Sequence, residues 1–311
     1  MITVIKPGMQ MTIQDLGRHG YRHLGIAQSG ALDPYAMIIA NRLVGNDDNQ
    51  SVIEITLGLA QLQFQCATVI ALHGADMQAK LDGVSIYPGW SYPVEQGQTL
   101  TFATARQGFR SYLAIKGGID CHAVMNSTAT DIAAGFGGLT GAPLQANDQV
   151  PITPFDGNWP QRGAIAPAKR SVIRVHSGPH QQLLSQQFSD FFAQTKWQVS
   201  PQSNRMGVRL STEHNQLMHT HSLPSLAVSP GSIQLTPSGE PIVLLNDGQT
   251  TGGYPLLGTI ISADQHQFAQ LKPGDFVIFE FVNLAAANTA QRKLDAHLQQ
   301  LTIALKNLSI R

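Results

Sequence analysis

The sequence predicts a mainly β fold with a few helices, arranged in two domains. Many runs of five or six apolar and β-branched residues are bounded by Gly, Pro, Asn or Asp, a pattern typical of short strands joined by turns. Segments with helical periodicity are few. The chain has 311 residues, and a domain usually takes roughly 100–200. Together these observations favour β-barrels or β-sandwiches over a parallel α/β sheet.

Six segments carry the strand pattern. In one of them, Leu100 and Phe102 alternate with threonines, so both side chains are expected on one buried face. The six predicted strands are Ala67–Leu72, Gln98–Ala103, Ser111–Ile115, Ser171–Val175, Pro241–Leu245 and Phe276–Phe281.

Three segments are predicted to be helical. Pro34–Val44 follows Asp33, a suitable N-cap, has proline at its first position and ends before Gly45. Gln181–Phe192 is a second helix, and Leu284–Lys306 is a third because its leucines recur at helical spacing.

The predicted domains are an N-terminal β domain over residues 1–165, a C-terminal β domain over 166–285, and a C-terminal helix over 286–311. The Pro- and Gly-rich stretch 151–168 is the predicted linker. A weak internal repeat favours two related domains, because Gly20-Tyr21-x-x-Leu24-Gly25 is echoed by Gly253-Tyr254-x-x-Leu257-Gly258. Two unrelated glycine turns would give the same pattern.

The charge balance excludes some classes of partner. Lys and Arg number 20, as do Asp and Glu, and only 13% of residues are charged. Nucleic acid is not an expected partner, because binding to phosphates needs clustered surplus cations. No run approaches the roughly 20 apolar residues of a membrane span, and no secretory signal is visible. With only two cysteines, the sequence indicates a cytoplasmic protein that is free to bind another subunit or a second copy of itself.

Two Gly-rich segments could present carboxylates to a ligand. Asp15 and Arg18 lie in Thr12–Gly20, where they either face a small-molecule substrate or pair with each other at a turn. Asp131 ends the hydroxyl-rich run Asn126–Asp131 and precedes further glycines, in either a ligand loop or a plain connector. Asp15 and Asp131 are therefore candidate acid/base residues.

A third candidate segment holds two arginines. If Ser203–Arg209 is a strand, Arg205 and Arg209 share one face and both could bind a carboxylate or phosphate. The alternative is two surface arginines that pair with acids elsewhere.

The segment that follows the apolar run Pro241–Leu245 has the composition most typical of a ligand loop. It combines amide and hydroxyl side chains with glycines that expose backbone N–H groups. Its candidate substrate-binding residues are Gln249, Thr250, Thr251, Gly252, Gly253 and Tyr254.

Several common catalytic motifs are absent from the sequence. It has no GxxxxGK[ST] phosphate loop, no GxSxG elbow and no HExxH pair, and no lysine in the Met-Lys-Met setting of covalent biotin. His214, His219 and His221 lie close in sequence, but this spacing is weak support for a metal, and no metal site is expected.

Long motifs identify a family resemblance that extends over about residues 1–285. They are Thr12–Gly20, Gly30–Asp33, Asn41–Asn46, Tyr112–Ala114 with Gly117–Ile119, Ser203–Leu210 and Gln249–Pro255. On these residues the chain resembles the biotin-dependent carboxyltransferase-like family, which includes allophanate hydrolase subunit 2. The resemblance implies cyclophilin-like β-barrel domains.

Chains of this size in the family resemble a subunit of a bacterial ATP-dependent 5-oxoprolinase, which opens 5-oxoproline (pyroglutamate) to glutamate. The resemblance implies partner subunits A and B, with B related to kinase-inhibitor and allophanate hydrolase subunit 1 proteins, and ATP used by the complex. It leaves two alternatives open: a non-catalytic regulator that antagonises a kinase inhibitor, and a biotin-dependent carboxyltransferase component of urea or allophanate metabolism.

One position departs from the family pattern. Many members have Gly-Ser-Arg-Ser-Thr-Asp where this chain has Asn126-Ser127-Thr128-Ala129-Thr130-Asp131. Thr128 stands in place of the arginine, so an anion contact made by that arginine is not expected here.

Overall fold

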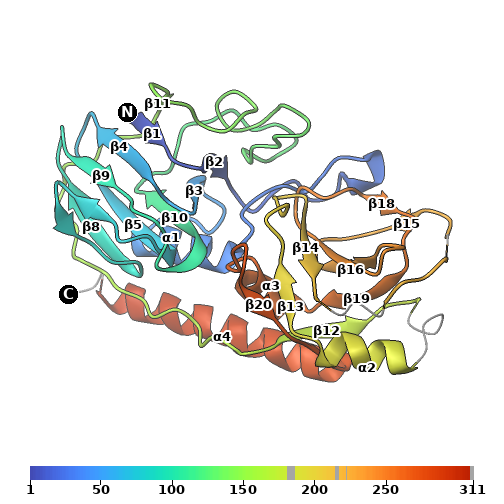
Figure 1. Cartoon of the computed structure of the whole chain (residues 1–311). Coiled ribbons are helices and arrows are strands. Elements are labelled where there is room, and N and C mark those ends of the chain that lie inside the picture. Colours follow the sequence, from blue (N-terminus) through green and yellow to red (C-terminus); the bar gives the residue numbers. More distant parts are fainter. Residues whose placement is uncertain (181–185, 214–216, 222, 309–311) are drawn as a thin grey trace. The chain divides into compact units, whose positions relative to one another are not determined.

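The computed structural model describes residues 1–308 except 181–185, 214–216 and 222 (Figure 1). The chain divides into two compact units. Unit 1 comprises Met1–Arg18, Ser29–Pro167 and the chain from His297 onward, and unit 2 comprises His19–Gln28 and Ala168–Ala296. Both are built mainly of antiparallel strands, as the sequence predicts.

Unit 1 contains two antiparallel sheets. The strands of the six-stranded sheet are, in order, β11 (Gln149–Val150), β1 (Ile2–Pro7), β4 (Ala60–Phe64), β9 (Thr99–Thr101), β6 (Lys80–Leu81) and β7 (Val84–Ser85). Those of the five-stranded sheet are β2 (Gln10–Gln14), β3 (Val52–Thr56), β10 (Gln107–Ile115), β5 (Thr68–Asp76) and β8 (Trp90–Val94).

The two sheets enclose one hydrophobic core. Val4 and Leu62 from the first sheet pack in the same cluster as Met11 and Leu72 from the second. Helix α1 (Pro34–Leu43) packs on β5 and β10. Interior strand β3 is buried at every position, because the core covers one face of its sheet and other segments cover the opposite face.

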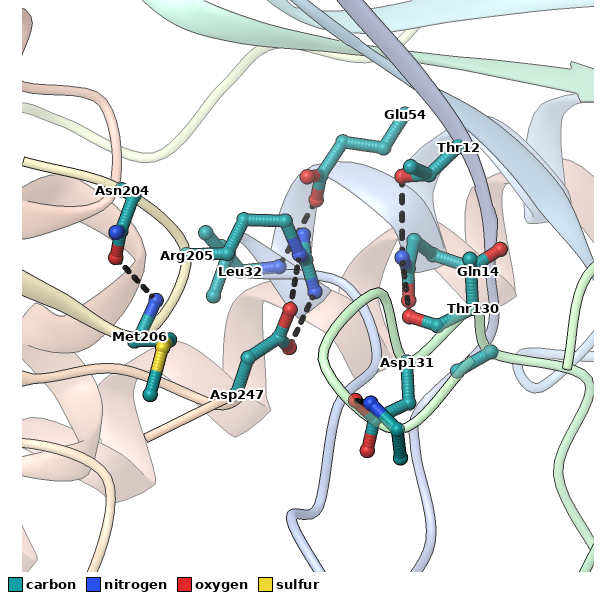
Figure 2. Close-up of polar contacts among 12 residues, drawn as sticks. Thr12, Gln14, Leu32, Glu54, Thr130, Asp131, Asn204, Arg205, Met206 and Asp247 are labelled. Atoms are coloured by element: carbon teal, nitrogen blue, oxygen red, sulfur yellow. Dashed lines mark hydrogen bonds and ion pairs between the residues drawn. The ribbon is translucent and has the colours of Figure 1, made fainter. Parts of the chain in front are cut away.

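A buried polar network fixes the start of α1. The backbone N–H of Leu32 donates to Glu54 Oε2 at 3.1 Å (Figure 2), and the Tyr112 hydroxyl donates to the same oxygen at 2.8 Å. The Tyr112 hydroxyl also accepts from Asp33 N–H at 2.8 Å, and Asp33 caps the helix. Burial and the neighbouring Glu54 hold the pKa of Tyr112 well above its ordinary value, so the phenol keeps its proton and can donate.

Unit 2 contains an eight-stranded sheet that is nearly closed. Its strands are, in order, β20 (Phe276–Val277), β13 (Trp197–Val199), β14 (Gly207–Ser211), β17 (Pro241–Leu244), β16 (Ser232–Leu235), β19 (Leu256–Ile260), β12 (Ile173–Ser177) and β21 (Phe279–Phe281). The first and last strands in this order are separated in the chain by Ile278 alone, so the sheet must curl back on itself. Strands β15 (Leu226–Ala227) and β18 (Thr251–Gly252) form a separate short pair.

Unit 2 also contains helices α2 (Gln186–Gln194) and α3 (Ser262–Phe268) and the 3₁₀ turn η1 (Arg22–Leu24). Helix α4 (Leu284–Leu308) contributes residues to both units. Phe192 of α2 stacks on Phe279 with ring centroids 4.9 Å apart. No helix in the described part of the chain is both long enough and apolar enough to span a membrane.

Most predicted elements are present, with shifts of a few residues at their ends. Leu100 and Phe102 are both buried, as their alternation predicts. The segment Phe276–Phe281 is two strands rather than one, because its halves pair at opposite edges of the sheet. Helix α3 was not predicted, and residues 181–185 of the second predicted helix lie outside the described residues.

The proposed internal repeat is wrong. Tyr21 precedes a 3₁₀ turn and Leu24 is its last residue, whereas Leu257 and Gly258 lie in strand β19. Both copies also belong to unit 2, so they do not mark equivalent positions of two domains. Segment His19–Gln28, which falls in the predicted domain 1–165, joins unit 2 as well.

Candidate functional site

Unit 1 contains a cavity of about 460 Å³ beside the end of β2. Its walls are mostly polar and come from four parts of the chain. The lining residues are Asp15, Asn49, Gln50, Ser51, Gly117, Ile119, Asp120, Cys121, Ala123, Asn126, Ser127, Thr128 and Thr153. The predicted acid/base residue Asp15 therefore forms part of the cavity wall.

Four hydrogen bonds hold the Asp15 carboxylate. Oδ1 accepts from Gly17 N–H and from the Ser127 hydroxyl, both at 2.7 Å. Oδ2 accepts from the Thr128 N–H at 2.7 Å and the Thr128 hydroxyl at 3.2 Å. The Thr128 hydroxyl also lies 2.7 Å from the Ser51 hydroxyl. Asp15 is only 2% exposed, so its orientation is fixed by these donors.

Gly118 lies beside this wall and has φ of +78°, which favours glycine. A Cβ at this position would lie 1.8 Å from Gln50 Nε2, so a larger residue would also displace the Gln50 side chain. Gln50 reaches across the glycine pair and donates to Gly117 O at 3.4 Å.

Arg18 does not pair with Asp15 among the described residues. Its guanidinium instead donates to the carbonyl oxygens of Val124 and Ala129 and lies over the Phe136 ring. The turn alternative considered from the sequence is therefore wrong, and Arg18 instead ties the 124–136 loop to the end of β2.

Asp131 is buried in a different place. Its Oδ1 accepts from Ala134 N–H at 3.0 Å, which closes the turn before Phe136, and the residue does not line the cavity. The preceding residue, Thr130, bonds to β2 through Ile13 O, and Gln14 donates both to Thr12 Oγ1 and to Thr130 O (Figure 2).

In unit 2 the two predicted arginines have different surroundings. Arg205 is buried and forms a bidentate ion pair with Asp247, at 2.8 Å and 3.0 Å (Figure 2). Arg209 is exposed in β14. Strand β14 begins only at Gly207, so Arg205 lies outside it and the two guanidinium groups do not converge on one face.

The predicted ligand loop 247–255 forms around Arg22 and Gln234, which the sequence analysis did not select. Arg22 donates to Gln249 O at 2.9 Å and to Val228 O at 2.8 Å. Gln249 Nε2 donates to the Oε1 of buried Gln234 at 3.1 Å. Burial lowers the pKa of Arg22 from its ordinary value.

Within this loop, Gly252 lies against Gln234 and Tyr254 is exposed. A Cβ at Gly252 would lie 2.1 Å from Gln234 Nε2, so a larger residue in β18 would require the Gln234 side chain to move. Thr251 and Gly252 pair with Ala227 and Leu226, while Tyr254 is 43% exposed. Tyr254 and Gln249 are thus the exposed residues of the loop with long polar side chains, and the Gln249 amide is also bonded to Gln234.

Other residues of the cavity were also missed by sequence reasoning. Asn49 and Ser51 belong to the polar run Asn46–Ser51, which has the composition of an ordinary turn, and only the fold brings them to Asp15. Cys121 lines the cavity as a free thiol, and burial together with Asp120 raises its pKa to about 11. Among the described residues no group of three His, Cys, Asp or Glu side chains could hold a metal, and His214 lies outside them.

Comparison with known proteins identifies the family. Residues 24–281 match the model of the carboxyltransferase domain, subdomain A and B. The chain belongs to this family. Carboxyltransferase-domain relatives include the C subunit of the 5-oxoprolinase of Escherichia coli (strain K12), which is 40% identical over 99% of both chains. The corresponding 5-oxoprolinase C subunit of Haemophilus influenzae is 37% identical over 97% of both.

One solved structure has a closely similar fold. The K. lactis urea amidolyase superposes with a TM-score of 0.88 at 28% sequence identity. The match covers 96% of this chain but 20% of that protein, so most of the urea amidolyase has no counterpart here.

Proposed function

We propose that this chain is a subunit of an ATP-dependent 5-oxoprolinase, which opens 5-oxoproline to glutamate together with partner subunits A and B and is inactive alone. The observation that carries the proposal is the end-to-end match to the C subunit of the Escherichia coli 5-oxoprolinase. The similarity to urea amidolyase covers only a small part of that protein, so it supports a carboxyltransferase role less well.

The chemistry of ring opening explains why polar groups of this kind would be useful. A lactam is a poor electrophile, and phosphorylation of its oxygen by ATP makes attack on the carbonyl carbon feasible. Water then adds to that carbon, the C–N bond breaks to leave an acyl phosphate and a free amine, and a second water releases phosphate and glutamate. Preorganised hydrogen-bond donors stabilise the negative charge of the phosphoryl oxygens along this route. ATP is assigned to the complex as a whole, because the sequence has no P-loop that would mark a site on this chain.

We assign the residues by their exposure and contacts. Tyr254, Gln249 and Thr250 are the proposed substrate contacts of the exposed loop, with the backbone of Thr251, Gly252 and Gly253. Exposed Arg209 is available to a carboxylate, whereas Arg205 acts through Asp247 by fixing where the loop begins. Asp15 and Asp131 remain the proposed acid/base groups.

The test combines the purified chain with subunits A and B and measures glutamate release that depends on both ATP and 5-oxoproline. We expect activity only in the full mixture. Tyr254→Phe removes one hydroxyl that would bind substrate, so activity should fall by about tenfold, the effect of one lost hydrogen bond. Tyr87→Phe is the matched control, because Tyr87 is also exposed but belongs to unit 1 and is not part of the loop.

Two outcomes would contradict the proposal and indicate one of the alternative functions. Glutamate release by A and B at the same rate without this chain, combined with tight binding of the chain to B, indicates a regulator. Activity that appears only when a biotinylated carrier protein is added indicates a carboxyltransferase.

A further inference from the structure

The cavity of unit 1 has an unbalanced charge. Asp15 and Asp120 line it, and none of its lining residues is Lys, Arg or His. Two cations flank the lining segments in the sequence, but both have other partners: Arg18 contacts carbonyls and Phe136, and Lys116 lies 3.7 Å from the centroid of the Trp159 ring. The cavity therefore disfavours an anion and attracts a neutral or cationic group.

The hydroxyl groups in the wall have a fixed direction. A carboxylate oxygen only accepts, so the single hydroxyl proton of Thr128 is directed to Asp15 Oδ2. The distance of 2.7 Å between the Ser51 and Thr128 hydroxyls allows either to donate, and with the Thr128 proton on Asp15 it is the Ser51 hydroxyl that donates to Thr128 Oγ1. Ser51 Oγ has its proton committed and keeps lone pairs that can accept a hydrogen bond from a ligand.

Asn49 provides the complementary group. Its Oδ1 accepts from Leu16 N–H at 2.9 Å, which assigns the oxygen and leaves the Nδ2 amino group as a donor. Asn49 lines the same cavity as Ser51. The lining segment Asn49–Ser51 thus offers both an acceptor and a donor, a pairing that suits a carboxamide.

The loop that carries Thr128 is held in an unusual conformation. Val124 and Ser127 are bridged by backbone hydrogen bonds, and Met125 and Asn126 between them have φ of +54° and +61°. Two successive left-handed residues other than glycine are uncommon in a tight turn. This turn brings Ser127 and Thr128 onto Asp15.

We propose that this cavity binds the nitrogen end of a small molecule, a carboxamide or a primary ammonium group, which donates an N–H hydrogen bond to Ser51 Oγ. Its volume of about 460 Å³ lies in the range of small-molecule sites. This inference goes beyond the proposed function, because binding is measured on this chain alone and does not depend on ring opening.

The test uses three probes of similar size that each carry one methyl group: acetamide, methylammonium and acetate. Saturation-transfer difference NMR follows the methyl signals at ~10 mM, since ligands of so few atoms bind weakly. We expect saturable transfer to acetamide or methylammonium and none to acetate, which has the shape of acetamide but no N–H and a negative charge. The probe that binds distinguishes an amide ligand from an amine ligand.

Substitutions in the cavity wall test where the probe binds. Ser51→Ala should weaken it by about fivefold, the effect of one lost hydrogen bond. Thr128→Val should also weaken it, because Ser51 is then no longer held as an acceptor, and Thr128→Ser should restore it. Ser85→Ala, an exposed serine of β7 outside the cavity, is the control and should bind like the unaltered chain.

Equal transfer to acetate, transfer to none of the probes, or unchanged binding in both Ser51→Ala and Thr128→Val would overturn the proposal. Circular dichroism checks that each variant is folded. If Ser51→Ala does not fold, the comparison of Thr128→Val with Thr128→Ser decides.

Discussion

Arg205 and Arg209 are the same residue type only four positions apart, yet the structure gives them different roles. Arg205 and Asp247 each have 3% of the side chain exposed, so their ion pair is shielded from solvent. Arg209 is exposed in β14. A buried pair is costly to break because the remaining charge has lost its partner, whereas an exposed arginine contributes little to stability.

Arg205→Ala should therefore lower the free energy of unfolding by about 3–5 kcal/mol, because Asp247 is left buried without this partner. Arg209→Ala should change it by no more than ~0.5 kcal/mol. Urea denaturation of both variants measures the difference. A similar loss of unfolding free energy in both variants would show that solvent screens the Arg205–Asp247 pair and that its burial does not add to stability.

Cys121 allows a second test at the residue scale. Its raised pKa of about 11 means that only about one thiol in a thousand is ionised at pH 8, and the thiolate is the reactive form. Alkylation by iodoacetamide should be slow at neutral pH and should rise about tenfold per pH unit until the pKa is reached. Mass spectrometry reports Cys121 and Cys66 separately, and a plateau at Cys121 near pH 8 would contradict the raised pKa.

At the scale of elements, Arg42 joins helix α1 to the end of α4 within unit 1. It forms a bidentate ion pair with Asp48, with both bonds at 2.7 Å. Its Nη1 also donates to Leu298 O at 2.6 Å and to the Thr302 hydroxyl at 2.9 Å. Leu301 in the same turn of α4 is buried, so this polar contact acts together with apolar packing to hold the helix end.

Arg42→Ala should loosen the end of α4. We expect amide hydrogen exchange over residues 298–306 to accelerate by about tenfold, because two hydrogen bonds to the helix are lost. Arg42→Lys should rescue this only in part, since an ammonium cannot reproduce the bidentate fork. Arg292→Ala changes an exposed arginine on the same helix and should leave exchange in this region unaltered.

At the scale of the whole molecule, the low charge remains the main property that favours association. The net charge is zero with 11 histidines neutral, and the isoelectric point is about 7.2. Electrostatic repulsion between copies is therefore weakest near neutral pH.

Attraction between copies should be strongest near pH 7.2 and should fall on acidification to about pH 5.5, because every copy then carries a net positive charge. The second virial coefficient from static light scattering measures this and should be lowest near pH 7.2. A coefficient that does not change with pH would show that apolar contacts, and not the missing repulsion, control association.

Local patterns were enough to predict much of the fold. Alternation at Leu100 and Phe102, turn residues around the apolar runs, and the Asp33-Pro34 cap all depend on neighbours in the chain, and all of these are present in the structure. The same patterns selected Asp15 and the 247–255 loop as polar segments at strand ends.

The sequence by itself therefore determined that the protein is mainly β and has few helices. Its long motifs also determined which family it resembles. Only the tertiary structure decided that β20 and β21 lie at opposite edges of one sheet, that Arg205 is buried against Asp247, and that Ser127 and Thr128 hold Asp15 from more than a hundred residues away. The physical reason is that periodicity reports which residues are buried together along one element. The partner of a polar side chain depends on strand order and register, which no local pattern encodes.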